Sequence, residues 1–458
     1  MNEIKKIFTS EKIESDYLKE VAEAKYFLEL LTMEPDFKQN LEREPEKILQ
    51  QYKINHKFTD LQLLYDEEKL LAYKKKNKEL PLIVRRYQSF IKEKLLFREE
   101  MQKNKCAPQN KIMREWRQRQ VNRCWGELGG RNQSIIHTPV IFELNLGCSV
   151  GCPFCGVNAP KLTLVCDYAA NKELWQNILK TTKEIIGEAA GMGTCYYATE
   201  PLDNPDYEKF SQDFYAVFQR IPQVTTAVPL RDITRTKAVL QHMLDTKPTI
   251  FRFSVRSLAQ LRELHQAFRP EELLFVELLP QFSAAPNNSF SAVGRARKAD
   301  AEENTGETIS CISGFIINMA EKSVRLITPC GADKEHPTGE ICLGKEFFTS
   351  EQDFALIISK MIKEKMQNEL DPQKKIKFYS YFQYQEEDIG FSLMSKTGFK
   401  VHFKGNNEAL LYQKLGQEIV KGEKNRLELV SCLYEKGFAP ANIFLALNTL
   451  FKAGVLEE

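Results

Sequence analysis

Three cysteines lie close together in the segment Cys148-Ser-Val-Gly-Cys152-Pro-Phe-Cys155, a C-x3-C-x2-C pattern. Thiolates are the protein ligands that iron–sulfur clusters prefer, and three on one tight loop could hold three irons of a [4Fe–4S] cluster. The fourth iron would then have no protein ligand and would stay open to a substrate. A zinc site would instead need a fourth ligand at matched spacing, such as a second C-x2-C or an H-x3-H, and the sequence has neither. The pattern therefore favours a cluster with a chemical role.

The composition indicates the cellular compartment in which these thiols function and the classes of partner that are excluded. The chain has 458 residues and an odd number of cysteines, 11, which argues against a disulfide framework and for a reducing compartment. Its 64 basic and 62 acidic residues leave a net charge of +2, which is not the charge of a globally basic nucleic-acid binder. We find no run of 18 apolar residues and no signal-peptide core. We therefore expect a cytoplasmic protein with neither a nucleic-acid nor a membrane partner.

The cysteines follow a segment that alternates apolar and polar residues, Pro139–Leu146, and that pattern predicts a strand running into a loop. Beyond this loop, helical and strand patterns alternate up to residue 279. The predicted helices cover 173–186, 207–220, 235–244 and 258–268, and the predicted strands cover 193–198, 224–228, 249–255 and 273–279. Such a rhythm is typical of βαβ units and a parallel sheet, and the count suits a barrel or partial barrel. Residues 1–135 have helical periodicity throughout.

The cysteine spacing, with the aromatic Phe154 before the third cysteine, resembles the signature of the radical SAM superfamily. This resemblance implies an α/β fold with a partial (β/α)6 barrel over residues 136–345. It also implies that Cys148, Cys152 and Cys155 hold a [4Fe–4S] cluster whose open iron binds S-adenosylmethionine. One electron from an external electron donor would then cleave this cofactor to methionine and a 5′-deoxyadenosyl radical.

Other segments match the family's cofactor-binding elements. Glu200 and Pro201 resemble the end of its Gly-Gly-Glu-Pro motif, although Ala and Thr replace the glycines, and Glu200 would accept a hydrogen bond from the cofactor's ammonium group. Ser254 occupies the place of a serine that contacts the ribose or carboxylate. Arg256 could pair with the carboxylate or, equally, form a salt bridge at the barrel rim. The segment Gly294-Arg-Ala-Arg is similar to a turn frequent in peptide-modifying members.

The C-terminal residues 375–458, which follow a predicted connecting helix within 346–374, have the pattern of three strands and then three helices. They resemble the RiPP recognition element, a winged-helix-like domain that binds leader peptides. An extended leader could add as a strand to the edge at Phe399–Lys404, gaining main-chain hydrogen bonds. The alternative is a winged helix used for dimerisation or capping. DNA binding is disfavoured because the last predicted helix, 441–453, has Lys452 as its one basic residue.

Taken over nearly its whole length, the chain resembles the proteusin-type peptide epimerases of RiPP maturation. The resemblance implies inversion of L- to D-residues in a ribosomally made precursor peptide, with a neutral cysteine thiol returning a hydrogen to the opposite face of Cα. Cys330, after the predicted strand ending at Pro329 and at the barrel's expected open end, is the first candidate donor; Cys342 is the second and Cys311 the third. The alternative is a radical SAM maturase that forms a crosslink or thioether.

One stretch of the N-terminal region has a strong local charge. Between Ile83 and Arg123 there are twelve basic and four acidic residues. A solvated helix face and a surface for an acidic partner, such as an acidic peptide, are the two interpretations that remain open.

Overall fold

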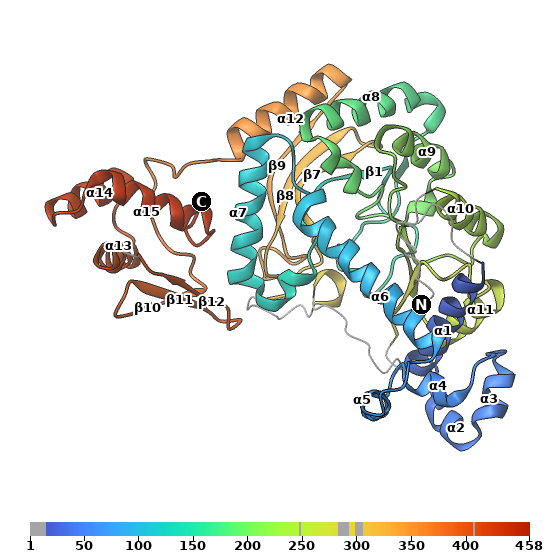
Figure 1. Cartoon of the computed structure of the whole chain (residues 1–458). Coiled ribbons are helices and arrows are strands. Elements are labelled where there is room, and N and C mark those ends of the chain that lie inside the picture. Colours follow the sequence, from blue (N-terminus) through green and yellow to red (C-terminus); the bar gives the residue numbers. More distant parts are fainter. Residues whose placement is uncertain (1–14, 247–248, 283–292, 298–305, 406–407) are drawn as a thin grey trace.

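The computed structural model describes residues 15–246, 249–282, 293–297, 306–405 and 408–458, which form a mixed α/β structure with a helical N-terminal region (Figure 1). The N-terminal helices are α1 (Ser15–Met33), α2 (Phe37–Arg43), α3 (Pro45–Gln51), α4 (Phe58–Gln62), α5 (Glu67–Lys75), α6 (Leu82–Glu100) and α7 (Lys111–Leu128). The helical periodicity predicted for residues 1–135 is thus confirmed from residue 15 onward, and residues 1–14 lie outside the described part. Helix α3 begins at Pro45, which has no N–H to donate and therefore suits the first turn of a helix.

The central region alternates strands and helices. Its elements are β1 (Thr138–Glu143), β2 (Asn145–Leu146), β3 (Leu164–Val165), α8 (Tyr168–Ile186), α9 (Tyr207–Phe218), β4 (Thr225–Thr226), α10 (Ile233–Asp245), β5 (Phe251–Val255), α11 (Leu258–Ala267), β6 (Val276–Pro280), β7 (Ile312–Asn318), β8 (Ser323–Pro329), β9 (Glu340–Phe347) and α12 (Glu351–Lys365). The predicted helices are confirmed within a few residues at each end. The predicted strand at 193–198 is reduced to a single bridge, between Thr194 and Gln223.

Two sheets hold this region together. Strands β4, β5 and β6 pair in parallel, as the βαβ pattern predicts, whereas the other sheet has the order β1-β7-β8-β9. In that second sheet β1 and β7 are parallel, and β7, β8 and β9 are antiparallel. The Phe142 N–H donates to the Thr194 carbonyl at 2.9 Å, so the Thr194 segment lies between β1 and β4. Parallel units are therefore present, and the complete (β/α)6 barrel stays a prediction.

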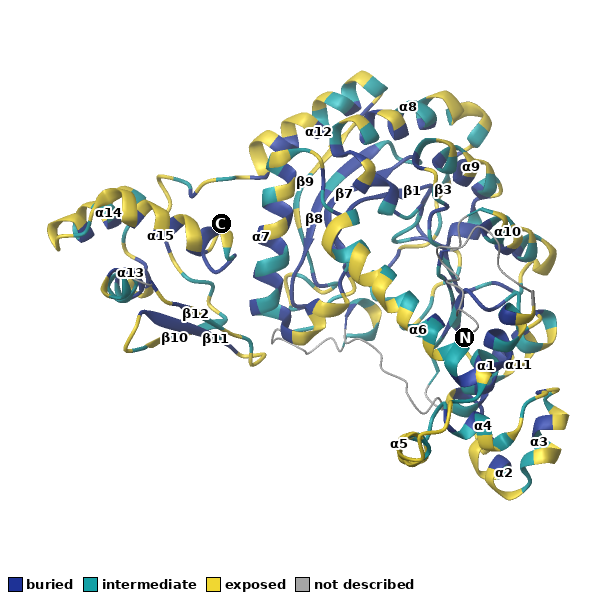
Figure 2. Ribbon diagram, in the orientation of Figure 1, coloured by how far each residue is buried: buried dark blue, intermediate teal, exposed yellow. Residues whose placement is uncertain are grey.

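Large apolar side chains on the outer face of β1 fix the helices against it. The ring of Phe142 packs edge-on against Trp175 of α8 at a centroid distance of 5.2 Å and against Phe214 of α9 at 6.0 Å. All three side chains are fully buried, and β1 is buried along its whole length (Figure 2). Because successive strand residues point to opposite faces, Ile141 and Glu143 face the other way, toward the inside of the sheets. No helix of the described ranges is long and apolar enough to cross a membrane.

The C-terminal residues form a smaller unit with its own core. Its elements are β10 (Phe382–Glu386), β11 (Phe391–Ser395), β12 (Lys400–Phe403), α13 (Ala409–Lys421), α14 (Arg426–Glu435) and α15 (Pro440–Lys452). The three strands pair antiparallel in chain order, with β11 in the middle. Buried apolar residues between Leu370 and Leu456 form a cluster separate from the main core. The predicted order of three strands and three helices is confirmed.

This unit docks on α7, and the docking explains part of the basic stretch. Arg119 is 3% exposed, pairs with Glu458 at 2.5 Å and lies over the ring of Phe451 at 4.0 Å. Arg117 and Arg123 are equally buried and donate to main-chain carbonyls of His137 and Pro329. Both interpretations of the basic stretch are therefore wrong for these three arginines, which are buried because backbone carbonyls and carboxylates satisfy their guanidinium groups.

Replacing Arg119 with alanine should loosen the C-terminal unit. The change leaves the Glu458 carboxylate and the Gln367 carbonyl without their guanidinium donor, which should lower the free energy of unfolding by about 2–4 kcal/mol. Urea denaturation measures the loss, and limited proteolysis should show faster cleavage between residues 366 and 378. Asn122→Ala is the matched control, because the half-buried Asn122 makes a single hydrogen bond across the same contact, to Lys452. Equal effects of the two changes would contradict this role of Arg119.

Candidate active site

The cysteine loop begins directly after β2 and returns at β3. Strands β2 and β3 pair antiparallel, so they close residues 147–163 into one loop, and the Cys148 N–H donates to the Pro160 carbonyl at 2.9 Å. Gly147 has φ of 87°, and a Cβ there would lie 2.2 Å from the Lys161 carbonyl oxygen. Only glycine fits this close approach, which turns the loop so that the cysteines follow at the carboxyl end of β1.

The three thiols of this loop are free and partly exposed. The Val150 N–H donates to Sγ of Cys148 and the Ala159 N–H donates to Sγ of Cys155, both at 3.4 Å. Hydrogen bonds from the main chain to sulfur are one of the features that tune iron–sulfur clusters. In the described ranges no three His, Cys, Asp or Glu side chains are arranged to hold a metal ion. The donor set nevertheless fits three irons, since partly exposed thiols on one loop can be reoriented by rotation about χ1.

Glu200 is a buried carboxylate that follows the Thr194 segment. It is 3% exposed, and its two oxygens accept N–H bonds from Leu202 at 3.2 Å and Ala227 at 2.9 Å. Burial raises its pKa, although the N–H donors act in the opposite direction. The amide of Asn145 donates to the Glu200 carbonyl at 3.1 Å, which ties this segment to the base of the cysteine loop.

Two residues that the sequence did not indicate tie the cysteine loop to the Glu200 segment. The Asp203 carboxylate accepts the Ser149 N–H at 2.8 Å and pairs with Arg231 at 2.7 Å. Arg231 in turn donates to the Ser149 hydroxyl at 2.8 Å. The Asp203–Arg231 ion pair and its hydrogen bonds to Ser149 therefore join the loop, the segment after Glu200 and the segment after β4. No sequence motif marks Asp203 or Arg231, because their partners lie 28 to 82 positions away.

The segment at Gly294, which the sequence indicated only as a turn, also holds the cysteine loop in place. The Arg295 N–H donates to the Cys155 carbonyl at 3.0 Å, and its guanidinium donates to the Cys152 carbonyl at 3.0 Å. Gly294 also approaches the Cys155 carbonyl so closely that a Cβ would lie 2.4 Å from that oxygen. This turn therefore holds the Cys152–Cys155 part of the loop, whereas Asp203 holds the loop at Ser149.

The predicted cofactor contacts Ser254, in β5, and Arg256, directly after it, face the same side of the sheet. Ser254 and Arg256 alternate with the buried Phe253 and Val255, so both point away from the helices. Arg256 is exposed and lines a cavity of about 330 Å³ together with Arg231. It lies close enough to Cys152 to act against the burial that raises the pKa of that thiol. Arg256 makes no ion pair within the described part of the chain, so the structure gives no support to a rim salt bridge. Phe154 is partly buried within the loop itself.

The candidate donor cysteines lie in different surroundings. Cys330 is 2% exposed, and burial raises its pKa far above the ordinary value. Cys342 is exposed on β9, and its Sγ donates to the Gly344 carbonyl at 3.6 Å. Cys311 is partly buried and packs with Ile141 on the inner face of β1.

The position of Cys330 differs from the expected open end. Strand β8 is antiparallel to β7, which is parallel to β1, so Cys330 follows the end of β8 that lies beside the amino ends of β1 and β7. The loop that contains Cys330 is nevertheless connected to the cysteine loop through main-chain hydrogen bonds. The Cys330 N–H donates to Gly339, and the Pro337 carbonyl accepts from Gly294, next to the residue that binds Cys155. None of these contacts joins the Cys330 thiol itself to the cysteine loop.

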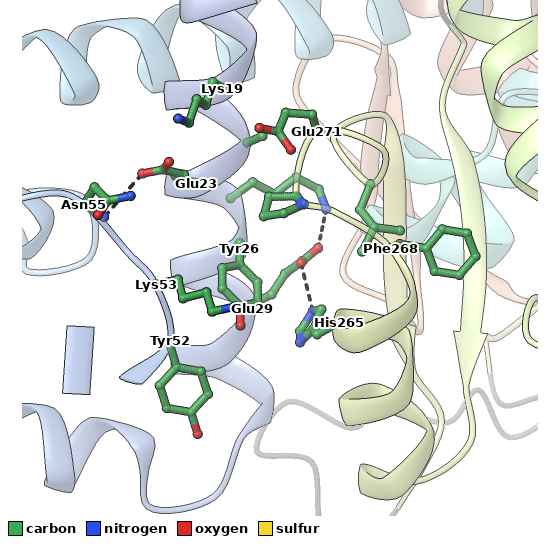
Figure 3. A pocket seen from close by; sticks show the side chains of 14 residues that line it. Lys19, Glu23, Tyr26, Glu29, Tyr52, Lys53, Asn55, His265, Phe268 and Glu271 are labelled. Carbon is green, nitrogen blue, oxygen red and sulfur yellow. Dashed lines mark hydrogen bonds and ion pairs between the residues drawn. The ribbon is translucent and has the colours of Figure 1, made fainter. Parts of the chain in front are cut away.

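A separate cavity of about 260 Å³ lies between α1 and α11 (Figure 3). Two of its three acidic side chains have basic partners: Glu29 contacts His265 at 3.5 Å and pairs with Lys25, and Glu23 lies 3.2 Å from His56. Burial would raise the pKa of Glu29, but these cationic neighbours outweigh it and lower the pKa. We interpret the Glu29–His265 contact as one that helps to fix α1 on α11.

Comparison with known proteins gives one relative in sequence. No family model matches the chain. A protein of Sinorhizobium fredii described as "Uncharacterized protein y4wI" is 33% identical over 413 residues, which cover 87% of this chain and 79% of y4wI. The chain belongs to the y4wI family.

Among solved structures, BtrN in complex with AdoMet and 2-DOIA matches with a TM-score of 0.30 and 16% identity, over 41% of this chain and 71% of BtrN. Such a score is too low to carry an argument about this chain. Since y4wI has no described activity, the function of this member of the y4wI family has to be argued from its own residues.

Proposed function

We propose that this chain is a radical SAM peptide epimerase that converts L- to D-residues in a ribosomally made precursor peptide. The observation that carries the proposal is the loop of three free thiols, held at two places, beside the buried carboxylate of Glu200. Neither a structural zinc site nor a redox disulfide needs three cysteines with a shared carboxylate neighbour. The resemblance described from the sequence supplies the reaction class.

In this proposal Cys148, Cys152 and Cys155 hold the cluster. The bound [4Fe–4S] cluster and S-adenosylmethionine supply hydrogen-atom abstraction from Cα. The chain's own residues orient the cofactor: Glu200 accepts from its amino group, and Arg256 and Ser254 face its carboxylate and ribose. The free guanidinium of Arg256 on the 330 Å³ cavity is suited to a carboxylate, because an arginine fork matches both carboxylate oxygens.

Replacing Glu200 with glutamine should weaken cofactor binding and the fold together. One of the Leu202 and Ala227 N–H groups would face an NH2 group, so we expect a loss of about 1–3 kcal/mol in the free energy of unfolding. The Kd for S-adenosylmethionine, measured by calorimetry, should rise about 10-fold through loss of the charge-assisted bond. Glu263→Gln is the matched control, an exposed acid on the cavity that Arg256 lines. Unchanged cofactor binding in Glu200→Gln would contradict the assigned contact.

The second half of the reaction returns hydrogen to the other face of the planar Cα radical. Among the three candidate cysteines we propose Cys330 for this step, because its raised pKa keeps the thiol protonated at neutral pH, although it lies beside the amino ends of β1 and β7 and its thiol makes no contact with the cysteine loop among the described residues. The S–H bond breaks homolytically and a Cα–H bond forms, which leaves a thiyl radical on Cys330. One electron from the external donor and one proton from solvent restore the thiol. The peptide is isomerised without net oxidation.

The precursor would be held by the C-terminal unit. Strand β12 pairs with β11 on one side, and its other edge has no strand partner within the described residues. An added leader strand at Phe399–Lys404 would also lie beside α7, because Phe399 stacks on Trp125 at a centroid distance of 6.2 Å. The leader would thus bind where the C-terminal unit meets the central region, and that position suits delivery of the attached core peptide.

A labelling experiment tests the proposal and its alternative. The enzyme, a precursor peptide, S-adenosylmethionine and a reductant are incubated in D2O. An epimerase should add about one mass unit per inverted residue and yield D-amino acids on hydrolysis, since the thiol hydrogen exchanges with solvent. A maturase that forms a crosslink or thioether should instead remove two hydrogens per bond. Absence of deuterium at Cα in modified peptide would refute the epimerase.

A further inference from the structure

A second cavity, of about 350 Å³, lies at the opposite end of the strands from the cysteine loop. It is lined by Thr138 at the first position of β1, by Ile250 just before β5, and by Glu277 at the second position of β6. Helix α6 covers it from outside with Leu95 and neighbouring side chains. The volume is in the range of small-molecule sites, and its lining is largely apolar.

The charged groups of this cavity are not balanced. Its lining contains four basic side chains and one acidic side chain. The acid, Glu277, pairs with Lys94 at 2.5 Å and with Arg252 at 2.9 Å. Burial alone would raise its pKa, but the two cations lower it to about 2, so it stays ionised. Arg98 donates to the Ser134 carbonyl at 2.8 Å.

Arg220 is the basic residue without a matching partner. Its guanidinium lies 5.2 Å from the ring centroid of Phe97, and the described residues offer it neither an ion pair nor a side-chain hydrogen bond. Burial lowers its pKa. Arg220 is half-buried, and a guanidinium partly withdrawn from water without an anion is costly, so this arrangement favours the binding of an anion.

An amide that lines the same cavity as Arg220 points to the same conclusion independently. The Nε2 of Gln223, which lines the same cavity, is buried and has no hydrogen-bond partner among the described residues. A buried N–H donor without an acceptor is rare in folded proteins. One oxyanion within reach of Arg220 and Gln223 would satisfy both groups at once.

We propose that this cavity binds a small organic carboxylate, with the carboxylate held by Arg220 and Gln223 and an apolar body among the side chains of α6 and the strand ends. The carboxylate matches the planar guanidinium fork and the amide donor. The apolar walls favour a hydrocarbon or aromatic body over a phosphate or sulfate ion. This site is separate from the cysteine loop, so it does not depend on the proposed epimerase activity.

Calorimetry with 3-phenylpropionate and the full-length protein tests the site, with 3-phenylpropanamide as the uncharged control. We expect one saturable site for the acid and at least about 10-fold weaker binding of the amide. Arg220→Gln should weaken binding of the acid about 10-fold or more and leave binding of the amide within about 2-fold. No binding of the acid, or equal binding to wild type and Arg220→Gln, would overturn the proposal.

Two further measurements make the test decisive. If Arg220→Gln unfolds, as judged by circular dichroism, Gln223→Leu removes the other donor at similar volume and should weaken the acid about 3- to 10-fold. A short peptide that ends in a free phenylalanine carboxylate distinguishes a peptide terminus from a free acid as the source of the same chemistry. Sulfate binding as tightly as 3-phenylpropionate would contradict the apolar body and overturn the assignment.

Discussion

Cys152→Ala is expected to abolish the visible absorption of the iron–sulfur cluster and to lower 5′-deoxyadenosine formation at least about 1,000-fold, or about 4 kcal/mol. The reason is that three thiolates are the minimum set on this loop, and two cannot hold the cluster in place. The loop itself should survive, because the Arg295 contact to residue 152 uses the main-chain carbonyl. Iron and sulfide analysis with chromatography of the reaction products measures both effects.

Cys432→Ala is the matched control for this change. Cys432 is a partly buried thiol of α14, in the C-terminal unit and far along the chain from the loop. The Cys432→Ala change should leave the iron content and the rate of 5′-deoxyadenosine formation within about 2-fold of wild type, as changes away from the core and the site usually do. If Cys152→Ala retained the cluster, or if Cys432→Ala lost it, the assignment of the three-cysteine loop would be wrong.

Cys330→Ser should separate the two halves of the reaction. Formation of 5′-deoxyadenosine should stay within about 2-fold of wild type, whereas incorporation of deuterium at Cα should fall at least about 100-fold. A serine O–H bond is too strong to give up its hydrogen atom to a Cα radical. Serine also nearly preserves the volume of this 2% exposed position, so cavity formation does not obscure the result.

The other two candidate cysteines provide the controls. Cys342→Ser removes an exposed thiol and Cys311→Ser removes a thiol on the inner face of the sheets, and neither should stop inversion. If inversion persisted in Cys330→Ser and ceased in either of the others, the donor would be that other cysteine. If inversion ceased in none of the three, hydrogen would come from another group and the thiol step would be refuted.

The cysteine loop shows how much of a site local sequence can determine. The spacing of Cys148, Cys152 and Cys155, with the glycine before them and the alternating segment that precedes it, is contained in about 20 consecutive residues. The strand, the turn and the exposure of the thiols follow from those residues, because backbone conformation and side-chain alternation depend mainly on near neighbours. Glu200 could be predicted for the same reason, from a short motif at the end of a predicted strand.

The position of Cys330 could not be obtained in this way. The sequence predicted a strand that ends at Pro329 correctly, and that alone is compatible with either end of the sheet. The direction of β7 relative to β1 decides which end carries Cys330, and this direction depends on packing between segments about 170 residues apart. Strand pairing of that kind leaves no periodic signal in either segment.

By itself, then, the amino-acid sequence determined the helices of the N-terminal region, the alternating central elements, the C-terminal order of three strands and three helices, and the loop of three thiols. Tertiary structure alone decided that Asp203, Arg231 and Arg295 clamp that loop, that Arg119 of α7 is buried against the C-terminal unit, and that Arg220 lines a cavity with no ion pair among the described residues. The physical reason is that hydrophobic periodicity and turn chemistry act over a few residues. Ion pairs and buried hydrogen bonds instead join whichever residues the packed core brings together, and a single sequence does not show which those are.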